Sequence, residues 1–200
     1  MSDIASKAGK LFVLAAPSGC GKTTLVYKLV DQMRPHCSFE RVVTFTSRAA
    51  RPTDRPGCDY HFISAQEFQD RIQQNFFLEW STAYGSYYGT PKTLIEQVER
   101  GACLITVVDH VGVQSITKKY PKTIGIWLVP PSFEILEHRL RGRGTENVAD
   151  IERRLQLAGY ELELEQQTRF CKYHIINDAI DSTLEQLKAV VLSEIGLLKK

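Results

Sequence analysis

The most constraining feature of this chain is a glycine-containing run near its N-terminus. Residues 16–23 read Ala-Pro-Ser-Gly-Cys-Gly-Lys-Thr, between an apolar stretch at residues 11–15 and a helical pattern at residues 24–30. This order of strand, loop and helix is typical of a phosphate-binding loop, in which glycines let backbone N–H groups turn towards phosphate oxygens. The N-terminus of the following helix adds partial positive charge at the same place. The run therefore predicts that the chain binds a nucleoside triphosphate.

The side chains of this loop have separate expected roles. Lys22 is placed to reach the outer phosphates, and Thr23 to hold a magnesium ion. Ala16 stands where the motif usually has its first glycine, so the backbone there needs ordinary angles. The alternative is a glycine turn before an ordinary helix, but such a turn does not require the Gly-Lys-Thr spacing. The residues expected to bind the triphosphate are Ala16, Pro17, Ser18, Gly19, Cys20, Gly21, Lys22, Thr23 and Thr24.

The size and composition of the chain narrow its class. Its 200 residues, of which 43% are hydrophobic, suffice for one domain with a sizeable core. A net charge of +2 is too near zero to indicate a nucleic-acid or membrane surface. No apolar run approaches the roughly 20 residues that span a bilayer, so we expect a cytoplasmic protein without membrane or nucleic-acid partners. Five cysteines without a Cys-x-x-Cys pair argue against a disulfide framework or a zinc site.

Apolar runs spaced along the chain predict its fold class. Residues 11–15, 103–108 and 124–129 have the continuous apolar character of strands buried on both faces. Helical patterns separate these runs, which is typical of a parallel sheet with crossover helices. A short strand at residues 173–176 and an amphipathic helix at residues 184–198 complete the pattern. We therefore expect an α/β core.

The segment between the first helix and the run that begins at Cys103 has a different character. It holds short strand-like pieces joined by Arg, Pro and Gly, which predict a small β-rich lobe inserted in the core. These pieces are residues 42–45, 60–63 and 77–80. Ser64 begins a capping box that opens a helix over residues 68–74, and Pro91 is expected to open another helix that ends at Glu99.

A second irregular segment lies in the C-terminal half. Ser132 follows two prolines and is expected to begin a helix that runs through Leu140. An arginine- and glycine-rich break at residues 141–146 interrupts the pattern, and a long charged helix follows over residues 149–167. A glycine-containing break between two helices is typical of a mobile lid.

Separated motifs along the chain resemble those of the guanylate kinases, from about residue 10 to the last helix. They are Ala-Pro-Ser-Gly-Cys-Gly-Lys-Thr-Thr at residues 16–24, Thr-Ser-Arg-Ala-Ala-Arg-Pro at 46–52, Gly-Cys-Asp-Tyr-His-Phe at 57–62, Phe-Leu-Glu-Trp at 77–80, Tyr-Tyr-Gly-Thr at 87–90, Gly-Arg-Gly-Thr-Glu at 142–146 and Ile-Asn-Asp at 176–178. The resemblance implies an enzyme that uses ATP and Mg²⁺ to phosphorylate GMP, and dGMP as well.

The same resemblance implies an architecture. It is the P-loop kinase fold, with a three-layer α/β/α core around a parallel sheet, an inserted GMP-binding lobe and a helical arginine-rich lid. Within a single domain at residues 1–200, we expect the core at about residues 8–40, 96–138 and 158–200, the lobe at about 41–95 and the lid at about 139–157.

The lobe carries side chains that suit the phosphate of a nucleoside monophosphate. Arg48 and Arg51 offer planar forks that match a phosphate dianion, and Tyr60 and Tyr88 add hydroxyl donors. The resemblance implies that these four residues bind the GMP phosphate. The alternative is a pair of surface arginines in a solvated loop, because charged residues are mostly exposed.

Three further residues suit the guanine base. A buried carboxylate at Glu79 would accept hydrogen bonds from the guanine N1–H and amino group, a donor pattern that adenine does not present. Thr44 and Thr90 stand where the family commonly has serine, and their hydroxyls would hydrogen-bond the base edge. The alternative for Glu79 is a charge on an edge strand.

The resemblance also implies residues for phosphoryl transfer. Arg139, Arg143 and Arg154 match the family's lid and flanking arginines, and would close over the phosphates together with Lys22 and magnesium. Asn177 matches a loop near the ATP base, with a helix cap or an Asx turn as its alternative.

The end of the run at residues 103–108 matches the family less completely. Asp109 matches a carboxylate that helps to fix magnesium waters or the guanine, with the N-cap of a helix that begins at His110 as its alternative. The chain has Val107 where the family usually has an acid, and Val111 where it commonly has glutamine. Because of these two changes, an enzyme with slow turnover stays an open alternative.

Two further functions stay open at this point. One is a kinase of another small phosphorylated acceptor on the same scaffold. The other is a guanylate-kinase-like binding domain that has lost catalysis and binds partner peptides, although such domains typically lack a working phosphate loop. The oligomeric state, monomer or homo-oligomer, is left open as well.

Overall fold

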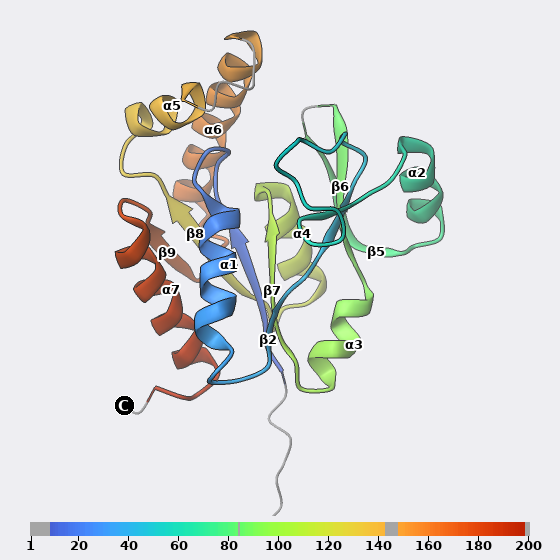
Figure 1. The fold of residues 1–200 in the computed structure, drawn as a ribbon, viewed down its shortest axis with the longest axis vertical. Coiled ribbons are helices and arrows are strands. Elements are labelled where there is room, and N and C mark those ends of the chain that lie inside the picture. The colour runs from blue at the N-terminus through green and yellow to red at the C-terminus, as the bar shows by residue number, and fades with distance from the viewer. Residues whose placement is uncertain (1–8, 84, 143–147, 199–200) are drawn as a thin grey trace, which may run out of the picture.

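A five-stranded parallel sheet forms the centre of the molecule (Figure 1). The computed structural model describes residues 9–83, 85–142 and 148–198. The strand order is β2-β7-β1-β8-β9. The strands are β1 (Leu11–Ala15), β2 (Phe39–Arg41), β7 (Cys103–Val108), β8 (Ile124–Val129) and β9 (Tyr173–Ile176). The three buried strands expected from the sequence lie side by side in this sheet, so the predicted α/β fold is confirmed.

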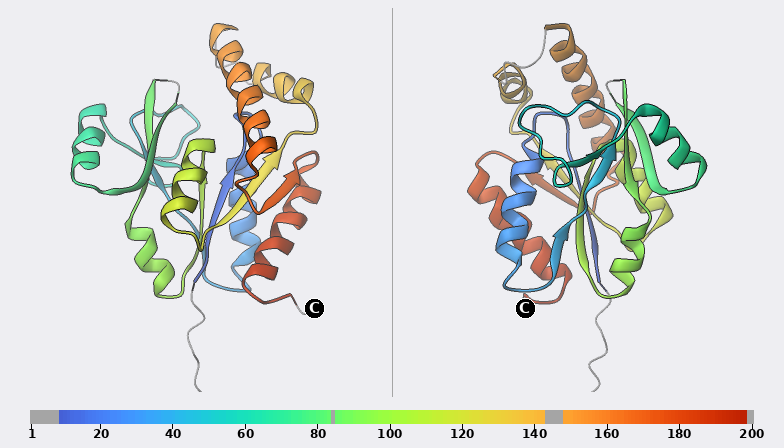
Figure 2. Two further views of the ribbon diagram at one scale, coloured as in Figure 1. Left: turned by 180° about the vertical axis from the view of Figure 1, so that it is seen from behind. Right: turned by 45° about the vertical axis from the view of Figure 1, so that its right-hand side comes forward.

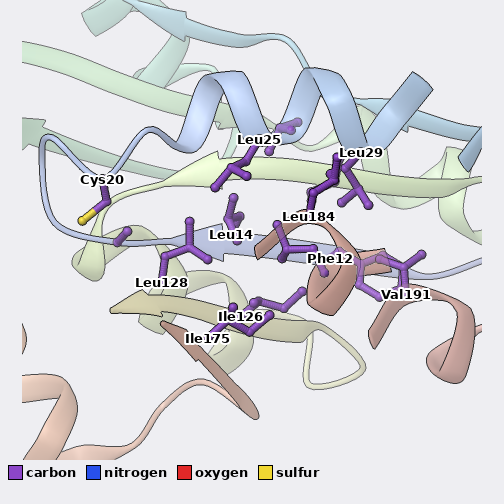
Figure 3. Close-up of a cluster of buried hydrophobic side chains, with 14 of the residues drawn as sticks. Phe12, Leu14, Cys20, Leu25, Leu29, Ile126, Leu128, Ile175, Leu184 and Val191 are labelled. Carbon is purple, nitrogen blue, oxygen red and sulfur yellow. The ribbon is translucent and has the colours of Figure 1, made fainter. Parts of the chain in front are cut away.

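Helices cover both faces of the sheet, because the side chains of β1 alternate between two cores. Phe12 and Leu14 pack on one face with the helices α1 (Lys22–Met33) and α7 (Ile180–Glu194), as Figure 3 shows. Leu11 and Val13 pack on the other face with α3 (Thr93–Glu99) and α4 (His110–Lys119). Figure 2 shows these layers from behind and after a turn of 45° from the view of Figure 1. None of the described helices is long and apolar enough to cross a membrane.

A second, four-stranded sheet forms a lobe beside the core, to the right in Figure 1. Its strands are β3 (Thr44–Thr46), β4 (Tyr60–Phe62), β5 (Phe77–Ala83) and β6 (Ser86–Pro91), in the order β4-β3-β6-β5. The helix α2 (Ala65–Gln73) closes this lobe, and its Phe68 ring stacks on Phe77 with centroids 4.4 Å apart. A Cβ atom at Gly89 would lie 2.8 Å from Phe68, so only glycine lets β6 pass beneath the stacked rings.

Two helices stand above the carboxyl ends of the parallel strands, at the top of Figure 1. They are α5 (Phe133–Arg141) and α6 (Val148–Thr168). The helix expected to begin at Ser132 is α5, and the Ser132 hydroxyl caps it by accepting a hydrogen bond from the Ile135 backbone N–H at 3.3 Å. Arg143, one of the predicted catalytic arginines, lies outside the described residues.

Some predicted elements differ from the observed ones. The strand β2 joins the core sheet next to β7, and β6 was not expected as a strand. Pro91 ends β6 and α3 begins at Thr93, so the helix predicted to open at Pro91 starts later. The strand β2 has three residues, too few for a hydrophobic period, whereas β6 has six but contains a glycine and a proline, which are disfavoured in strands. Partners from other elements decide whether such segments pair.

Candidate active site

A cavity of about 350 Å³ lies where the core, the four-stranded lobe and α6 meet. Most of the residues predicted to bind nucleotides line it, although they come from segments far apart in the sequence. The predicted residues at the cavity are Ala16, Ser18, Gly19, Cys20, Gly21, Lys22, Thr23, Thr24, Thr44, Arg48, Arg51, Tyr60, Glu79, Tyr88, Thr90, Asp109 and Arg154. The lining does not include Pro17, Arg139 or Asn177.

The phosphate loop has the backbone shape that its glycines predict. Gly19 and Gly21 have φ angles of 95° and 67°, in the left-handed region where residues with a Cβ are strained. Gly21 is the N-cap of α1, and no side chain caps this helix end. The N–H groups of the first turn therefore lack a side-chain acceptor from the cap residue, which suits the binding of an anion.

Two side chains, the half-buried Lys22 and the buried Asn177, brace this loop. The Lys22 Nζ donates to the carbonyl oxygens of Ala16 and Pro17, at 2.7 Å and 3.1 Å. The Asn177 amide nitrogen donates to the Cys20 carbonyl oxygen at 2.5 Å, across 157 residues of sequence. Because its amide faces the loop backbone, Asn177 acts here as a support of the loop. Its predicted place near the ATP base stays a prediction.

Replacing Asn177 with alanine is expected to weaken ATP binding without removing any group of the cavity lining. The Cys20 carbonyl oxygen would lose a buried donor, which costs about 1–3 kcal/mol and loosens the loop. We expect a higher ATP KM, a lower melting temperature and a nearly unchanged GMP KM. Asp178→Ala is the matched control, because Asp178 is the exposed neighbour. Equal ATP KM values in both variants would contradict this role.

The predicted catalytic arginines of α5 and α6 have different partners. Arg154 on α6 is buried, and its Nη1 donates to the Ser18 hydroxyl of the phosphate loop at 3.1 Å. Arg139 on α5 instead donates to the backbone carbonyl oxygens of Asn177 and Asp178, at 3.2 Å and 3.1 Å. Arg154 therefore faces the cavity, while Arg139 ties α5 to the segment after β9.

On the lobe side, the two predicted phosphate-binding arginines share one acid. Asp54 Oδ2 accepts hydrogen bonds from Arg48 Nη2 at 2.8 Å and from the Arg51 backbone N–H at 2.7 Å. The Arg48 guanidinium also lies 5.6 Å from the centre of the Tyr60 ring. Burial raises the pKa of Tyr60, so its hydroxyl keeps its proton and can donate. These contacts hold the loop in one shape and aim donors into the cavity.

Glu79 lies at the bottom of the cavity on the lobe side, with 3% of its surface exposed. Its Oε1 accepts a hydrogen bond from the Thr90 hydroxyl at 2.6 Å. Burial raises the pKa of Glu79 to about 7, and the nearby Asp109 charge adds to this, while Thr90 and Lys119 oppose it. A Cβ atom at Gly112 would lie 3.2 Å from Glu79 Oε2, so glycine there lets α4 come close. The result is a buried acceptor suited to a base that presents donors.

Asp109 uses both of its carboxylate oxygens within the protein. Its Oδ1 accepts from the Gly112 backbone N–H at 2.7 Å, and its Oδ2 accepts from the Ser81 hydroxyl at 2.6 Å. The N-cap role that the sequence offered as an alternative is therefore confirmed. The Ser81 contact joins α4 to β5, and it was not expected from the sequence.

The donor groups near the loop suit a magnesium ion. Thr23 supplies a hydroxyl oxygen and Asp109 a carboxylate at the same cavity, and hard oxygen donors are what Mg²⁺ prefers. Among the described residues, no group of three or more His, Cys, Asp or Glu is arranged to hold a metal ion.

Sequence reasoning did not single out Glu161, a buried acid of the cavity on α6. It follows Arg154 by two helical turns, so the two side chains share one face of α6. That spacing was visible in the sequence and is the signal that could have found it.

The parallel sheet with a phosphate loop between β1 and α1 makes this protein a P-loop kinase. Within that class, the chain belongs to the guanylate kinase family, because the family model described as guanylate kinase matches residues 8–194. Guanylate kinases are ATP:GMP phosphotransferases. The family and the enzyme class predicted from the sequence are thereby confirmed.

Individual relatives agree with this assignment. The guanylate kinase of Dechloromonas aromatica is 41% identical over 185 residues, which cover 92% of this chain and 89% of that protein. The guanylate kinase of Chlamydia caviae is 39% identical over 193 residues, which cover 96% and 92%. A crystal structure of guanylate kinase from Anaplasma phagocytophilum superposes with a TM-score of 0.78 at 26% identity, over 94% of this chain and 87% of that chain.

Proposed function

We propose that this chain carries out the reaction of its family, the transfer of the γ-phosphoryl group of ATP to GMP, in the cavity described above. The observation that carries this proposal is the pairing, within one cavity, of the phosphate loop with a buried carboxylate at Glu79. In this proposal residues 41–95 form the GMP-binding lobe and residues 139–157 form the lid. The cavity then lies between the segments that bind ATP and the segment that binds GMP.

The core and the lid supply the ATP side of the reaction. The N–H groups of the loop bind the phosphates, and Lys22 and Arg154 add positive charge from α1 and α6. Lys22 must leave the carbonyl oxygens of Ala16 and Pro17 to do so. Thr23 would hold Mg²⁺, with Asp109 acting through water. When bound, Mg²⁺ supplies positive charge that neutralises the charge developing on the transferred group.

The lobe supplies the acceptor side. Arg48, Arg51, Tyr60 and Tyr88 bind the GMP phosphate and orient one of its oxygens towards ATP. Because this oxygen is already ionised, the reaction needs no general base, and no covalent intermediate forms on the protein. Catalysis then depends on alignment, on fixed positive charge and on the exclusion of water.

The base is selected by hydrogen-bond pattern. The buried Glu79 accepts from the N1–H and amino group of guanine, while Thr44 and Thr90 meet the base edge. Adenine would leave the Glu79 carboxylate buried without its donors, which disfavours AMP strongly. The presence of Lys22 and Thr23 in an intact loop is the reason we prefer this function to a binding domain without catalysis.

A coupled assay of ADP formation tests this proposal. The full-length protein would be given ATP and Mg²⁺ with GMP, dGMP, AMP, CMP or UMP as acceptor. We expect turnover with GMP and dGMP only, because of the donor pattern that Glu79 requires. Fast turnover would also mean that Val107 and Val111 are tolerated at the cavity. If folded protein turned over none of these acceptors, the proposed transfer would be wrong.

A further inference from the structure

Glu161 is a buried carboxylate of the cavity that the proposed reaction does not yet use. It lies on α6 with 7% of its surface exposed, and it lines the cavity together with Lys22, Thr23 and Asp109. Burial raises the pKa of Glu161 to about 7, the positive charge of Lys22 opposes this rise, and the charge of Asp109 adds to it. A carboxylate held in such a place is unfavourable for folding unless a cation joins it.

The other described acids of the cavity have clear protein partners. These acids are Asp54, Asp59, Glu79 and Asp109, and their partners are Arg48 for Asp54, Tyr27 for Asp59, Thr90 for Glu79, and Ser81 and Gly112 for Asp109. Glu161 accepts a hydrogen bond from the His110 backbone N–H, and the positive charge of Lys22 acts on it. Among the acids of the described lining, it is the one that stands on α6, the helix from which Arg154 bonds Ser18 of the phosphate loop.

The end of β7, which lies at the same cavity, has few groups that could bind a metal ion or its waters. Val107 and Val108 line the cavity there with apolar side chains. Both oxygens of Asp109 already accept hydrogen bonds from protein groups. A magnesium ion keeps several of its waters in a kinase site, and these waters need acceptors in the surrounding protein. Glu161 reaches this place from α6, since it accepts a hydrogen bond from the His110 backbone N–H and lines the same cavity, and its carboxylate can serve as such an acceptor.

We propose that Glu161 is a positioning residue of the metal site, whose carboxylate accepts hydrogen bonds from water on the Mg²⁺ ion that Thr23 holds. The inference rests on the proposed function, which places the ion at Thr23. Since Arg154 on the same face of α6 bonds Ser18 of the phosphate loop, α6 contributes to both the phosphates and the metal. The lid helix then seats more firmly when nucleotide and metal are both bound.

The test measures how much Mg²⁺ strengthens ADP binding, by calorimetry on the full-length protein with Mg²⁺ and with EDTA. We expect Glu161→Gln to reduce this Mg²⁺ effect about tenfold, as loss of an outer-shell partner does, while ADP affinity in EDTA stays unchanged. Glutamine still offers an oxygen to the His110 N–H, so the fold is expected to persist. Glu163→Gln is the matched control, because Glu163 is exposed on the same helix. It should retain the wild-type Mg²⁺ effect.

The outcomes separate the inference from the function on which it rests. An unchanged Mg²⁺ effect in folded Glu161→Gln overturns the inference, even if turnover falls, because a purely structural role would leave the metal effect intact. If Glu161→Gln does not fold, Glu161→Asp decides: a reduced Mg²⁺ effect supports the inference, and an unchanged one overturns it. A Mg²⁺ effect that survives Thr23→Ala would instead contradict the metal site of the proposed function.

Discussion

Replacing Lys22 with alanine is expected to lower kcat by about 10² to 10³-fold, with the fold intact. The Lys22 ammonium is the cation of the phosphate loop, at the head of α1, and it lines the cavity. Its charge is needed most when negative charge spreads over the transferred group, so kcat should fall more than the ATP KM rises. The measurement is steady-state kinetics with GMP, together with thermal unfolding.

The control for this variant is Lys28→Ala. Lys28 lies on the same helix and is exposed, so its loss removes an equal charge far from the loop. We expect wild-type kcat in this control. If Lys22→Ala kept more than a small part of the wild-type kcat, the phosphate loop would not be the site of transfer.

Replacing Glu79 with glutamine is expected to lower kcat/KM for GMP by about a hundredfold or more, while the ATP KM changes little. Two hydrogen bonds from guanine to a buried carboxylate are each worth about 1.5–3 kcal/mol, and an amide oxygen replaces only one neutral acceptor. The ratio of kcat/KM for GMP to that for AMP should fall in parallel. Unchanged GMP kinetics would remove Glu79 from the base pocket.

The same variant makes a second measurement possible, because burial raises the pKa of Glu79 from 4.5 to about 7. The folded protein keeps this proton up to about pH 7, while the unfolded chain releases it near pH 4.5. Wild-type stability therefore falls as the pH rises through this window, and the loss is complete above it. Glutamine does not titrate, so the melting temperature of Glu79→Gln should exceed that of the wild type increasingly from pH 5 to 8. Parallel melting curves would contradict the buried charge.

The expected exchange of protein stability for GMP selectivity at Glu79 has a physical reason. A carboxylate that must be ionised to accept two donors is placed where water cannot compensate it, so the free protein is less stable at neutral pH. Binding of GMP recovers this lost stability, because the donors of the guanine base hydrogen-bond the Glu79 carboxylate. A gain in stability with a loss of selectivity would therefore also exclude unfolding as the cause of the kinetic defect.

Local patterns in the sequence were sufficient to predict several elements of the structure. The phosphate loop could be predicted because φ-positive glycines, a buried strand and a helix start are all local features, and Gly19 and Gly21 have the expected angles. The cap at Ser64 and the helix start at Ser132 were predicted for the same reason, and each serine accepts from an N–H three residues further on. The strands β2 and β6 escaped prediction, because β2 is short and β6 contains Gly89 and Pro91, so neighbours from other elements decide whether they pair.

The sequence by itself determined the class of chemistry, through the loop at residues 16–23, and the types of residue available for a guanine nucleotide. Only the tertiary structure decided the partners of those residues. It joined Arg154 to Ser18 across 136 residues, turned Arg139 towards the segment after β9, and placed Glu161 in the same cavity as Lys22. Hydrophobic periodicity reports which side of an element is buried, but contacts between distant side chains depend on how whole layers pack.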